Sequence, residues 1–262
     1  MISLDLQILP IGLLAAYKAN FDQSFQQKFE RLTDSELSAD SFSFYTSVSA
    51  VFSSKIEGED IELDSFIKHK LMGVKFEPDH TRKIDDLYEA YQFAKTAELN
   101  ADNVGKAHVL LTKHILHASQ QGQLRTGNMF VTTPDGKIEY VACLPGHVES
   151  ELNKLYRDIA ALLKADLGFE EVFYFASLIH LVFVKIHPFN DGNGRTARLL
   201  EKWFLAQKLG DKAWFIQSEK YYYEHHQTYY ANIREMGLEY ELLDYGKGMK
   251  FLGMLPASLM QF

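Results

Sequence analysis

The sequence has few cysteines, no long apolar run and no excess of positive charge. Its 262 residues include one cysteine, Cys143, so no disulfide can form within the chain. This fits a reducing compartment, and we expect a cytoplasmic protein. The most apolar stretch, 172–186, is interrupted by His180 and Lys185. It is shorter than the about 20 residues of a membrane-spanning helix. We therefore expect a helix in a protein core and no membrane partner.

The charge balance and the start of the chain exclude further classes. A net charge of −8 argues against non-specific nucleic-acid binding, and we expect no nucleic-acid partner. Asp5 precedes the first apolar run, and no Lys or Arg does. We therefore expect no signal peptide. With 47% hydrophobic residues the chain can build one large domain or a domain with an extension. The sequence leaves a homo-oligomer open.

Helical spacing of apolar residues dominates the chain and predicts an all-α fold. Helices are expected over 40–57, 63–74, 82–99, 106–119, 149–164, 170–186, 196–209 and 220–235. Asp40 is a good N-cap for the first of them, and Gly58 is a good stop. We see no repeat and no low-complexity segment.

One region favours strands, and one position favours a boundary. Short β-favouring runs flank Pro134-Asp135-Gly136, which predicts a small hairpin over 128–142. A soft boundary near 100–103 divides an N-terminal helical region, 1–104, from a core, 105–262.

The run HPFNDGNGRTAR, residues 187–198, carries the chemistry of the sequence. Arg195 and Arg198 fall in the first turn of a predicted helix, where the helix dipole disfavours cations. Gly192 and Gly194 let the backbone approach a ligand closely, and N–H groups at a helix start form an anion site. The two arginines supply cationic forks that suit phosphate oxygens.

Two further residues of the run suit phosphoryl chemistry. Asp191 is a hard oxygen ligand of the kind that Mg²⁺ uses beside substrate phosphates. His187 titrates near neutrality and can act as a general base. A Gly-Asn-Gly turn or a lone histidine is usually structural, but together, in this order, they favour a phosphate site.

The run resembles the Fic family signature, His-Pro-Phe-x-Asp/Glu-Gly-Asn-Gly/Lys-Arg-x-x-Arg, at every position. Upstream, 175–180 resembles the family's preceding helix, and 122–125 resembles its Gly-x-x-Arg before a flap. The likeness covers roughly 106–236. It implies a Fic-type helical bundle with a small β-hairpin flap and an N-terminal helical extension.

The resemblance also implies an activity and a role for each motif residue. Fic proteins with an intact motif transfer AMP from ATP to a Ser, Thr or Tyr hydroxyl of a target protein. His187 would be the base, Asp191 would hold Mg²⁺, and Phe189 would anchor the loop in the core. The nucleotide phosphates would contact Gly192, Asn193, Gly194, Arg195 and Arg198.

A second, shorter pattern is Ser-x-x-x-Glu-Gly at 53–58. Alone it is an ordinary helix end, although Glu57 is disfavoured there by the helix dipole. Beside the first motif it resembles the family's inhibitory motif, whose Glu pairs with the second arginine of the signature, here Arg198. The resemblance then implies a self-inhibited enzyme.

Weaker signals concern recognition. The hairpin over 128–142 resembles the flap on which a target segment docks, or it is an ordinary surface hairpin. It is followed by Leu144-Pro145-Gly146 where many relatives carry Pro-Pro. Tyr229 resembles a residue near adenine, but an aromatic stripe on a helix is as often core. Gly237 stands where some relatives have Asn.

Other candidate sites are interpreted as structural. His114, His117 and the pair His225-His226 lack convincing ligand spacing, so we expect no metal there. Cys143 has no visible activating neighbourhood and is expected to be a small buried residue.

The sequence leaves alternative functions open on the same fold. Family members remove AMP, with help from the inhibitory Glu, or transfer phosphate, UMP or phosphocholine. Phosphate-transferring relatives carry Lys in the place of Gly194, which disfavours that branch. A catalytically silent nucleotide-binding regulator is the non-enzymatic alternative, and the intact His187 and Asp191 count against it.

Overall fold

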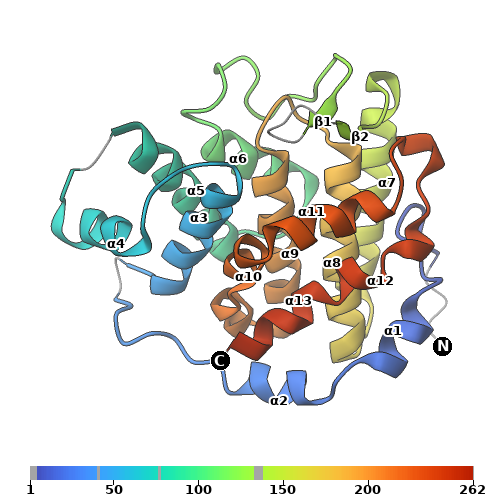
Figure 1. Ribbon diagram of the computed structural model, residues 1–262, viewed down its shortest axis with the longest axis horizontal. Helices are drawn as coiled ribbons and strands as arrows, with labels where there is room; N and C mark the ends of the chain where they lie inside the picture. The colour runs from blue at the N-terminus through green and yellow to red at the C-terminus, as the bar shows by residue number, and fades with distance from the viewer. Residues whose placement is uncertain (1–4, 40–41, 76–77, 133–137, 262) are drawn as a thin grey trace.

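The structure is a computed structural model that describes residues 5–39, 42–75, 78–132 and 138–261 (Figure 1). The α-helices are α1 (Leu14–Asn20), α2 (Ser24–Glu30), α3 (Phe44–Ile56), α4 (Leu63–Met72), α5 (Pro78–Thr96), α6 (Ala101–Leu111), α7 (Pro145–Lys164), α8 (Phe169–Ile186), α9 (Asn193–Leu209), α10 (Ser218–Glu224), α11 (His226–Glu235), α12 (Met249–Leu252) and α13 (Met254–Ala257). Short 3-10 turns η1 (Asp211–Phe215), η2 (Tyr240–Leu242), η3 (Tyr245–Lys247) and η4 (Ser258–Gln261) complete the helical part. The predicted all-α fold with a small hairpin is confirmed.

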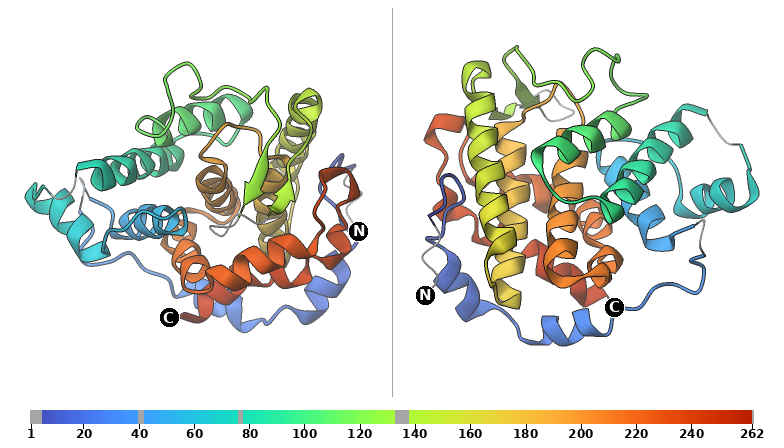
Figure 2. Two further views of the ribbon diagram at one scale, coloured as in Figure 1. Left: turned by 45° about the horizontal axis from the view of Figure 1, so that its top comes forward. Right: turned by 180° about the vertical axis from the view of Figure 1, so that it is seen from behind.

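Helices α8 and α9 form the centre of the molecule (Figures 1 and 2). Residues 172–186 of α8 are buried on every side, as the apolar run predicts. Helix α7 packs along α8, while α3, α5 and α6 contact α9 from its other side. The loop between α8 and α9 therefore lies between α7 on one side and α3, α5 and α6 on the other.

Helix α3 brings the second motif to this loop. Its N-cap is Ser43, whose side chain accepts a hydrogen bond from the N–H of Thr46. The predicted cap, Asp40, lies outside the described residues. The helix contacts α5, α9 and α10, and Glu57 is its C-cap. Gly58 follows with a φ of 91°, which favours glycine and turns the chain away.

Two helix predictions were wrong in their bounds. The helix expected over 106–119 begins at Ala101, because the Asn100 side chain caps it, and ends at Leu111. The helix expected over 220–235 is two helices, α10 and α11, that meet at His225. Periodicity alone missed α1 and α2.

Strands β1 (Phe130–Thr132) and β2 (Ile138–Val141) pair antiparallel, with Phe130 opposite Val141. The turn predicted at 134–136 lies outside the described residues. Within the described part of the chain, no helix has the length and apolar character needed to cross a bilayer.

Candidate active site

The candidate catalytic histidine ends helix α8 in a strained conformation. His187 has φ 53° and ψ 61°, and it is the only non-glycine residue with positive φ in the described part of the chain. Such a conformation costs of order 1–3 kcal/mol and persists where the surroundings enforce it. The turn directs the chain from α8 into the motif loop.

The buried guanidinium of Arg125 supports this turn. Its Nε donates to the carbonyl oxygen of His187 at 2.6 Å, and its Nη2 donates to those of Ile186, at 3.2 Å, and Cys143. The N–H of Arg125 donates to the carbonyl of Pro188 at 2.9 Å. A cation here satisfies carbonyls that the end of α8 leaves free and complements its dipole. The Gly-x-x-Arg resemblance contains this residue, but it predicted no role for it.

Side chains of the loop close it on itself. Asn193 accepts from the N–H of Phe189 at 2.9 Å and donates to its carbonyl at 2.8 Å. The Phe189 ring is buried and stacks on the imidazole of His108, so the predicted anchor is confirmed. His108 Nδ1 accepts from the N–H of Gly122, which leaves Nε2 to donate to the carbonyl of Asp191 at 3.0 Å. The loop is therefore held by contacts within the chain.

The backbone at the start of α9 approaches its neighbours closely. A Cβ at Gly192 would lie 2.7 Å from Cγ2 of Thr112, and Gly192 has a φ of 76°. A Cβ at Gly194 would collide with Oε1 of Glu57. The first N–H groups of a helix have no intrahelical acceptor and attract anions. The carboxylate of Glu57 lies over this helix start.

Glu57 also pairs with the second arginine of the motif, as the shorter motif predicts. Its Oε1 lies 2.6 Å from Nη2 of Arg198. Arg198 further donates to the Ser53 hydroxyl at 2.8 Å and to the Ser53 carbonyl at 3.0 Å. Burial alone raises the pKa of Glu57, but Arg198 and then Arg195 outweigh it and hold that pKa below its ordinary value. The carboxylate is therefore ionised at neutral pH.

One turn further along α9 the same face of α3 makes a second polar contact. Lys202 donates to the Ser49 hydroxyl at 2.6 Å and pairs with the buried carboxylate of Glu219 at 2.5 Å. Ser49, Ser53 and Glu57 are four residues apart, so they lie on one face of α3. Two cations of α9 thus hold that face of α3.

The first arginine of the motif has a weaker partner. Arg195 Nη2 lies 3.8 Å from Oε1 of Glu59, and the same oxygen accepts from Lys83 at 2.8 Å. Arg195 Nε is buried and has no hydrogen-bond partner within the described residues. The two arginines are therefore held differently, and the sequence did not predict the proximity of Glu59.

The imidazole of His187 is uncharged at neutral pH. Burial lowers its pKa to about 4, although the carbonyl of Val184 opposes this. Its Nδ1 lies 3.3 Å from that carbonyl oxygen and 3.1 Å from the hydroxyl of Tyr140. A neutral ring in this position can accept a proton.

Two more predicted site residues, Asp191 and Tyr229, differ in their exposure to solvent. Asp191 is exposed, and one carboxylate oxygen accepts from the N–H of Gly192 at 2.6 Å. Tyr229 is buried, and its hydroxyl lies 2.9 Å from Nε2 of His180 and 3.5 Å from Nη1 of Arg198. A contact between Tyr229 and the adenine of a nucleotide stays a prediction.

The other histidines show no metal constellation. His114 Nδ1 lies 2.8 Å from a carboxylate oxygen of Asp86. No group of three or more His, Cys, Asp and Glu side chains suited to a metal occurs among the residues that the structure describes. Cys143 is buried, and burial raises its pKa to about 11, in line with the predicted structural role.

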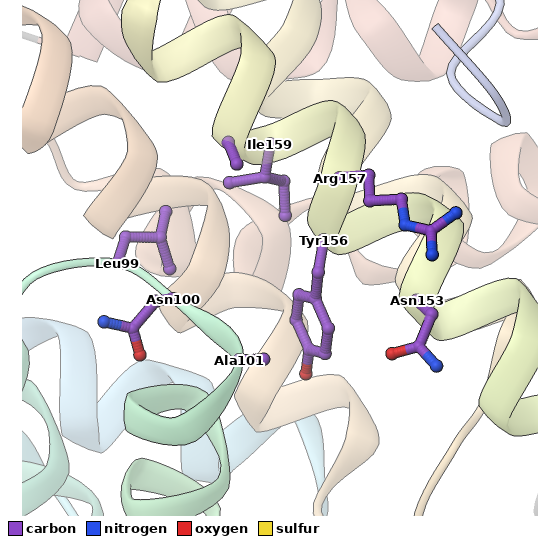
Figure 3. A pocket seen from close by; sticks show the side chains of 8 residues that line it. Leu99, Asn100, Ala101, Asn153, Tyr156, Arg157 and Ile159 are labelled. Carbon is purple, nitrogen blue, oxygen red and sulfur yellow. The ribbon is translucent and has the colours of Figure 1, made fainter.

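A separate pocket of about 410 Å³ lies between the start of α6 and α7. The ring of Tyr156 points into it, with Asn100 and Asn153 at its sides (Figure 3). None of the motif residues lines this pocket, so it is not part of the candidate site.

Comparison with known proteins assigns the loop and its surroundings. The Fic/DOC family model matches residues 98–205, which include Arg125, His187 and Arg198. Residues 98–205 of this chain form a Fic domain. Over its whole length the fold resembles the crystal structure of a Fic family protein from Desulfovibrio desulfuricans G20, with a TM-score of 0.73 and 16% sequence identity. That likeness covers 98% of this chain and 74% of the other.

Two curated relatives match the region of the Fic domain only in part. A segment of 106 residues is 34% identical to a protein named protein adenylyltransferase Fic from Nematostella vectensis, covering 40% of this chain and 22% of that protein. A segment of 130 residues is 31% identical to a ribonucleoside-diphosphate reductase small chain of Ostreid herpesvirus 1 (isolate France), covering 46% of this chain and 21% of that protein. The chain thus spans about a fifth of the length of either relative. The names of the two relatives refer to different activities.

Proposed function

We propose that this Fic domain is a protein adenylyltransferase that moves AMP from ATP to a hydroxyl of a target protein, and that Glu57 inhibits it. The proposal rests on one observation, the Glu57 carboxylate paired with Arg198 over the start of α9. The name of the Nematostella vectensis relative supports the reaction class. The rest of the site is consistent with this reaction.

His187 is the general base of the proposed reaction. Its neutral imidazole takes the proton of the target hydroxyl as that oxygen bonds to the α-phosphorus of ATP. The bond from the α-phosphorus to the leaving pyrophosphate breaks in the same displacement. N–H groups at the start of α9 and the two arginines oppose the charge of the phosphate oxygens. These donors are fixed before the reaction because the loop is closed by its own side chains.

Asp191 is the proposed Mg²⁺ ligand. Its carboxylate is exposed beside the helix start, and the N–H of Gly192 orients one of its oxygens. Mg²⁺ is often held by one or two carboxylates together with substrate phosphates, so a single aspartate fits. When bound, the ion neutralises charge on the phosphates.

The inhibition follows from competition between anions for one site. The Glu57 carboxylate occupies the position over Gly194 and one side of the Arg198 guanidinium. The outer phosphate of ATP would need the same donors. While Glu57 remains there, the triphosphate cannot take the geometry in which the target oxygen attacks the α-phosphorus in line.

The target segment is proposed to dock on the hairpin near 128–142. Strand pairing gives an extended segment its register, as in β-augmentation. The N–H of Val141 already donates to the carbonyl of Leu238 at 2.7 Å, so docking would use the remaining edge of the hairpin. Tyr140 of β2 lies beside His187, so the hairpin that would receive the target also contacts the base.

The test compares Glu57→Gly with the double variant Glu57→Gly/His187→Ala. Each is incubated with Mg²⁺, a cell extract and ATP labelled on either the α- or the γ-phosphate. We expect Glu57→Gly to transfer only the α-label, and the double variant to lose at least about a hundredfold in rate, because base catalysis is worth that much. Transfer of the γ-label, or equal transfer by both variants, would contradict the proposal.

Removal of AMP is the second candidate, and the ionised state of Glu57 favours it. That carboxylate is 27% exposed and its pKa is held low by Arg198, so it can orient a water. A pre-adenylylated target separates the two activities. AMP release that is lost in Glu57→Gln would support removal, while release by neither protein would leave transfer as the activity.

A further inference from the structure

Tyr140 lies between the hairpin and the catalytic histidine. It belongs to β2 and is 4% exposed. Its hydroxyl donates to the carbonyl of Val184 at 2.8 Å and lies 3.1 Å from Nδ1 of His187. The two rings meet edge to face, with centroids 6.0 Å apart. No motif contains Tyr140, and the sequence did not point to it.

The hydrogen-bond pattern determines which nitrogen of His187 is protonated. The carbonyl of Val184 can only accept, but at 3.3 Å it is a long and weak acceptor for a proton on Nδ1. The Tyr140 hydroxyl gives its single proton to the same carbonyl, so its oxygen is the closer acceptor for Nδ1–H, at 3.1 Å. Nε2 is then left without a proton, which is the form that a general base needs.

Tyr140 is itself held from its other side. The Lys185 ammonium lies 4.3 Å from the centroid of the Tyr140 ring, within the range of a cation–π contact. The same ammonium donates to the carbonyl of Gly237 at 3.2 Å. Burial raises the pKa of Tyr140 well above its ordinary value, so the hydroxyl stays neutral. These contacts restrict the position of the hydroxyl relative to His187.

We propose that Tyr140 is a positioning residue that orients the His187 imidazole and keeps its Nε2 unprotonated. The backbone of His187 is fixed by Arg125, while the plane of its ring is fixed by Tyr140. When Nε2 takes a proton, the positive ring still has the Tyr140 oxygen and the Val184 carbonyl as acceptors at Nδ1. Because Tyr140 belongs to the hairpin, the element proposed to receive the target also aligns the base. The catalytic part of this inference rests on the proposed function.

The variant that isolates the hydroxyl is Tyr140→Phe, which keeps the ring and its contact with Lys185. Its matched control is Tyr174→Phe, because the Tyr174 hydroxyl also donates to a carbonyl, that of Pro10, at 2.8 Å and the residue is also buried. Both variants lose one buried hydroxyl. A general loss of stability would therefore appear in both.

Two measurements test the proposal on the full chain. The first is the ¹⁵N spectrum of the His187 imidazole, assigned by its absence in His187→Ala. The second is kcat and KM for ATP in the Glu57→Gly background. We expect Tyr140→Phe to shift the imidazole signals away from the Nδ1-protonated form. We also expect it to lower kcat about tenfold with KM unchanged, a part of what base catalysis supplies. Tyr174→Phe should change neither.

Each outcome is decisive for a separate claim. An unchanged imidazole spectrum in Tyr140→Phe overturns the positioning role, whatever the activity. A changed spectrum with unchanged kcat also overturns it, because the ring orientation would then not matter for the reaction. If the Glu57→Gly parent transfers no AMP, the proposed function fails, and the spectrum still decides whether Tyr140 sets the protonation of His187.

Discussion

The two ends of the motif loop are held in different ways. At the end of α8, Arg125 and Tyr140 fix the backbone and ring of His187 from the domain itself. At the start of α9, Arg198 is held by Ser53 and Glu57, which arrive from α3 far away in the chain. The base is therefore preset, while the anion site is occupied by a carboxylate of the same chain. Under the proposed function, control would act on nucleotide geometry and leave the base untouched.

Arg125→Gln should have the largest effect on stability, and it acts at the end of α8, where His187 lies. It removes a buried guanidinium from the carbonyls of His187, Ile186 and Cys143. Carbonyls left unsatisfied by this change should lower the free energy of unfolding by about 3 kcal/mol. Urea unfolding measures it, with the exposed Arg157→Gln as control, which should stay within about 0.5 kcal/mol. Equal effects of the two variants would mean that Arg125 does not hold the turn.

Gly194→Ala tests the start of α9, because the sign of its effect on the free energy of unfolding depends on Glu57. The added Cβ would collide with Glu57 Oε1, so in the wild-type background it should lower the free energy of unfolding by about 1 kcal/mol. In the Glu57→Gly background the nearest atoms to the Cβ are those of the Arg198 guanidinium, at 3.2 and 3.4 Å. This flexible side chain, no longer held by Glu57, can shift by a few tenths of an ångström, so Ala should be neutral or favourable by about 0.5 kcal/mol through helix propensity. Thermal unfolding of the four proteins gives both values. The same sign in both backgrounds would place Glu57 elsewhere in solution.

The pH dependence of stability tests the charge of the contact between Glu57 and Arg198. The folded-state pKa of Glu57 lies below its ordinary value of 4.5, because Arg198 outweighs burial. The ionised carboxylate therefore stabilises the fold above the unfolded-state pKa, and this contribution is lost as the pH falls through the folded-state pKa. Wild type should have a higher unfolding midpoint than Glu57→Gln at pH 7, with the gap closing below about pH 4.5. A gap independent of pH would show that the charge is unimportant.

Glu59→Gln should have the smallest effect, and it separates the two arginines. Its carboxylate is 3.8 Å from Arg195 and is shared with Lys83, so its loss leaves Arg198 and Glu57 paired. We expect a change of less than about twofold in AMP transfer, as for a weak ion pair. A gain as large as that of Glu57→Gly would assign the inhibition to both carboxylates.

The parts of the site that the sequence predicted are those written in contiguous motifs. The helix that follows the motif, the buried α8 and the meeting of Glu57 with Arg198 all follow from local patterns and the family resemblance. Arg125, Tyr140 and His108 contact the loop from positions 47 to 83 residues away in the sequence, and no spacing rule links them to it. Their polar groups donate hydrogen bonds to carbonyl oxygens at and after the end of α8. Which carbonyls need such a donor is known only once the end of the helix is known.

The fold shows the same division. Long amphipathic helices were predicted, but the start of α6 was missed because Asn100 caps it before the apolar pattern begins. The break at His225 was missed because the aromatic residues on both sides continue the helical pattern. Boundaries depend on single caps and tertiary contacts, which periodicity does not contain.

The most direct test of the central claim is the initial rate of α-phosphate transfer by Glu57→Gly and by its matched control, Glu62→Gly. Glu62 also forms an ion pair, with Lys55 at 2.8 Å, but it is 76% exposed and lies away from both arginines. We predict at least about a tenfold gain for Glu57→Gly, since a charge-assisted hydrogen bond of that strength is removed, and no gain for Glu62→Gly. Equal rates for wild type and Glu57→Gly, with His187→Ala inactive, would contradict the account.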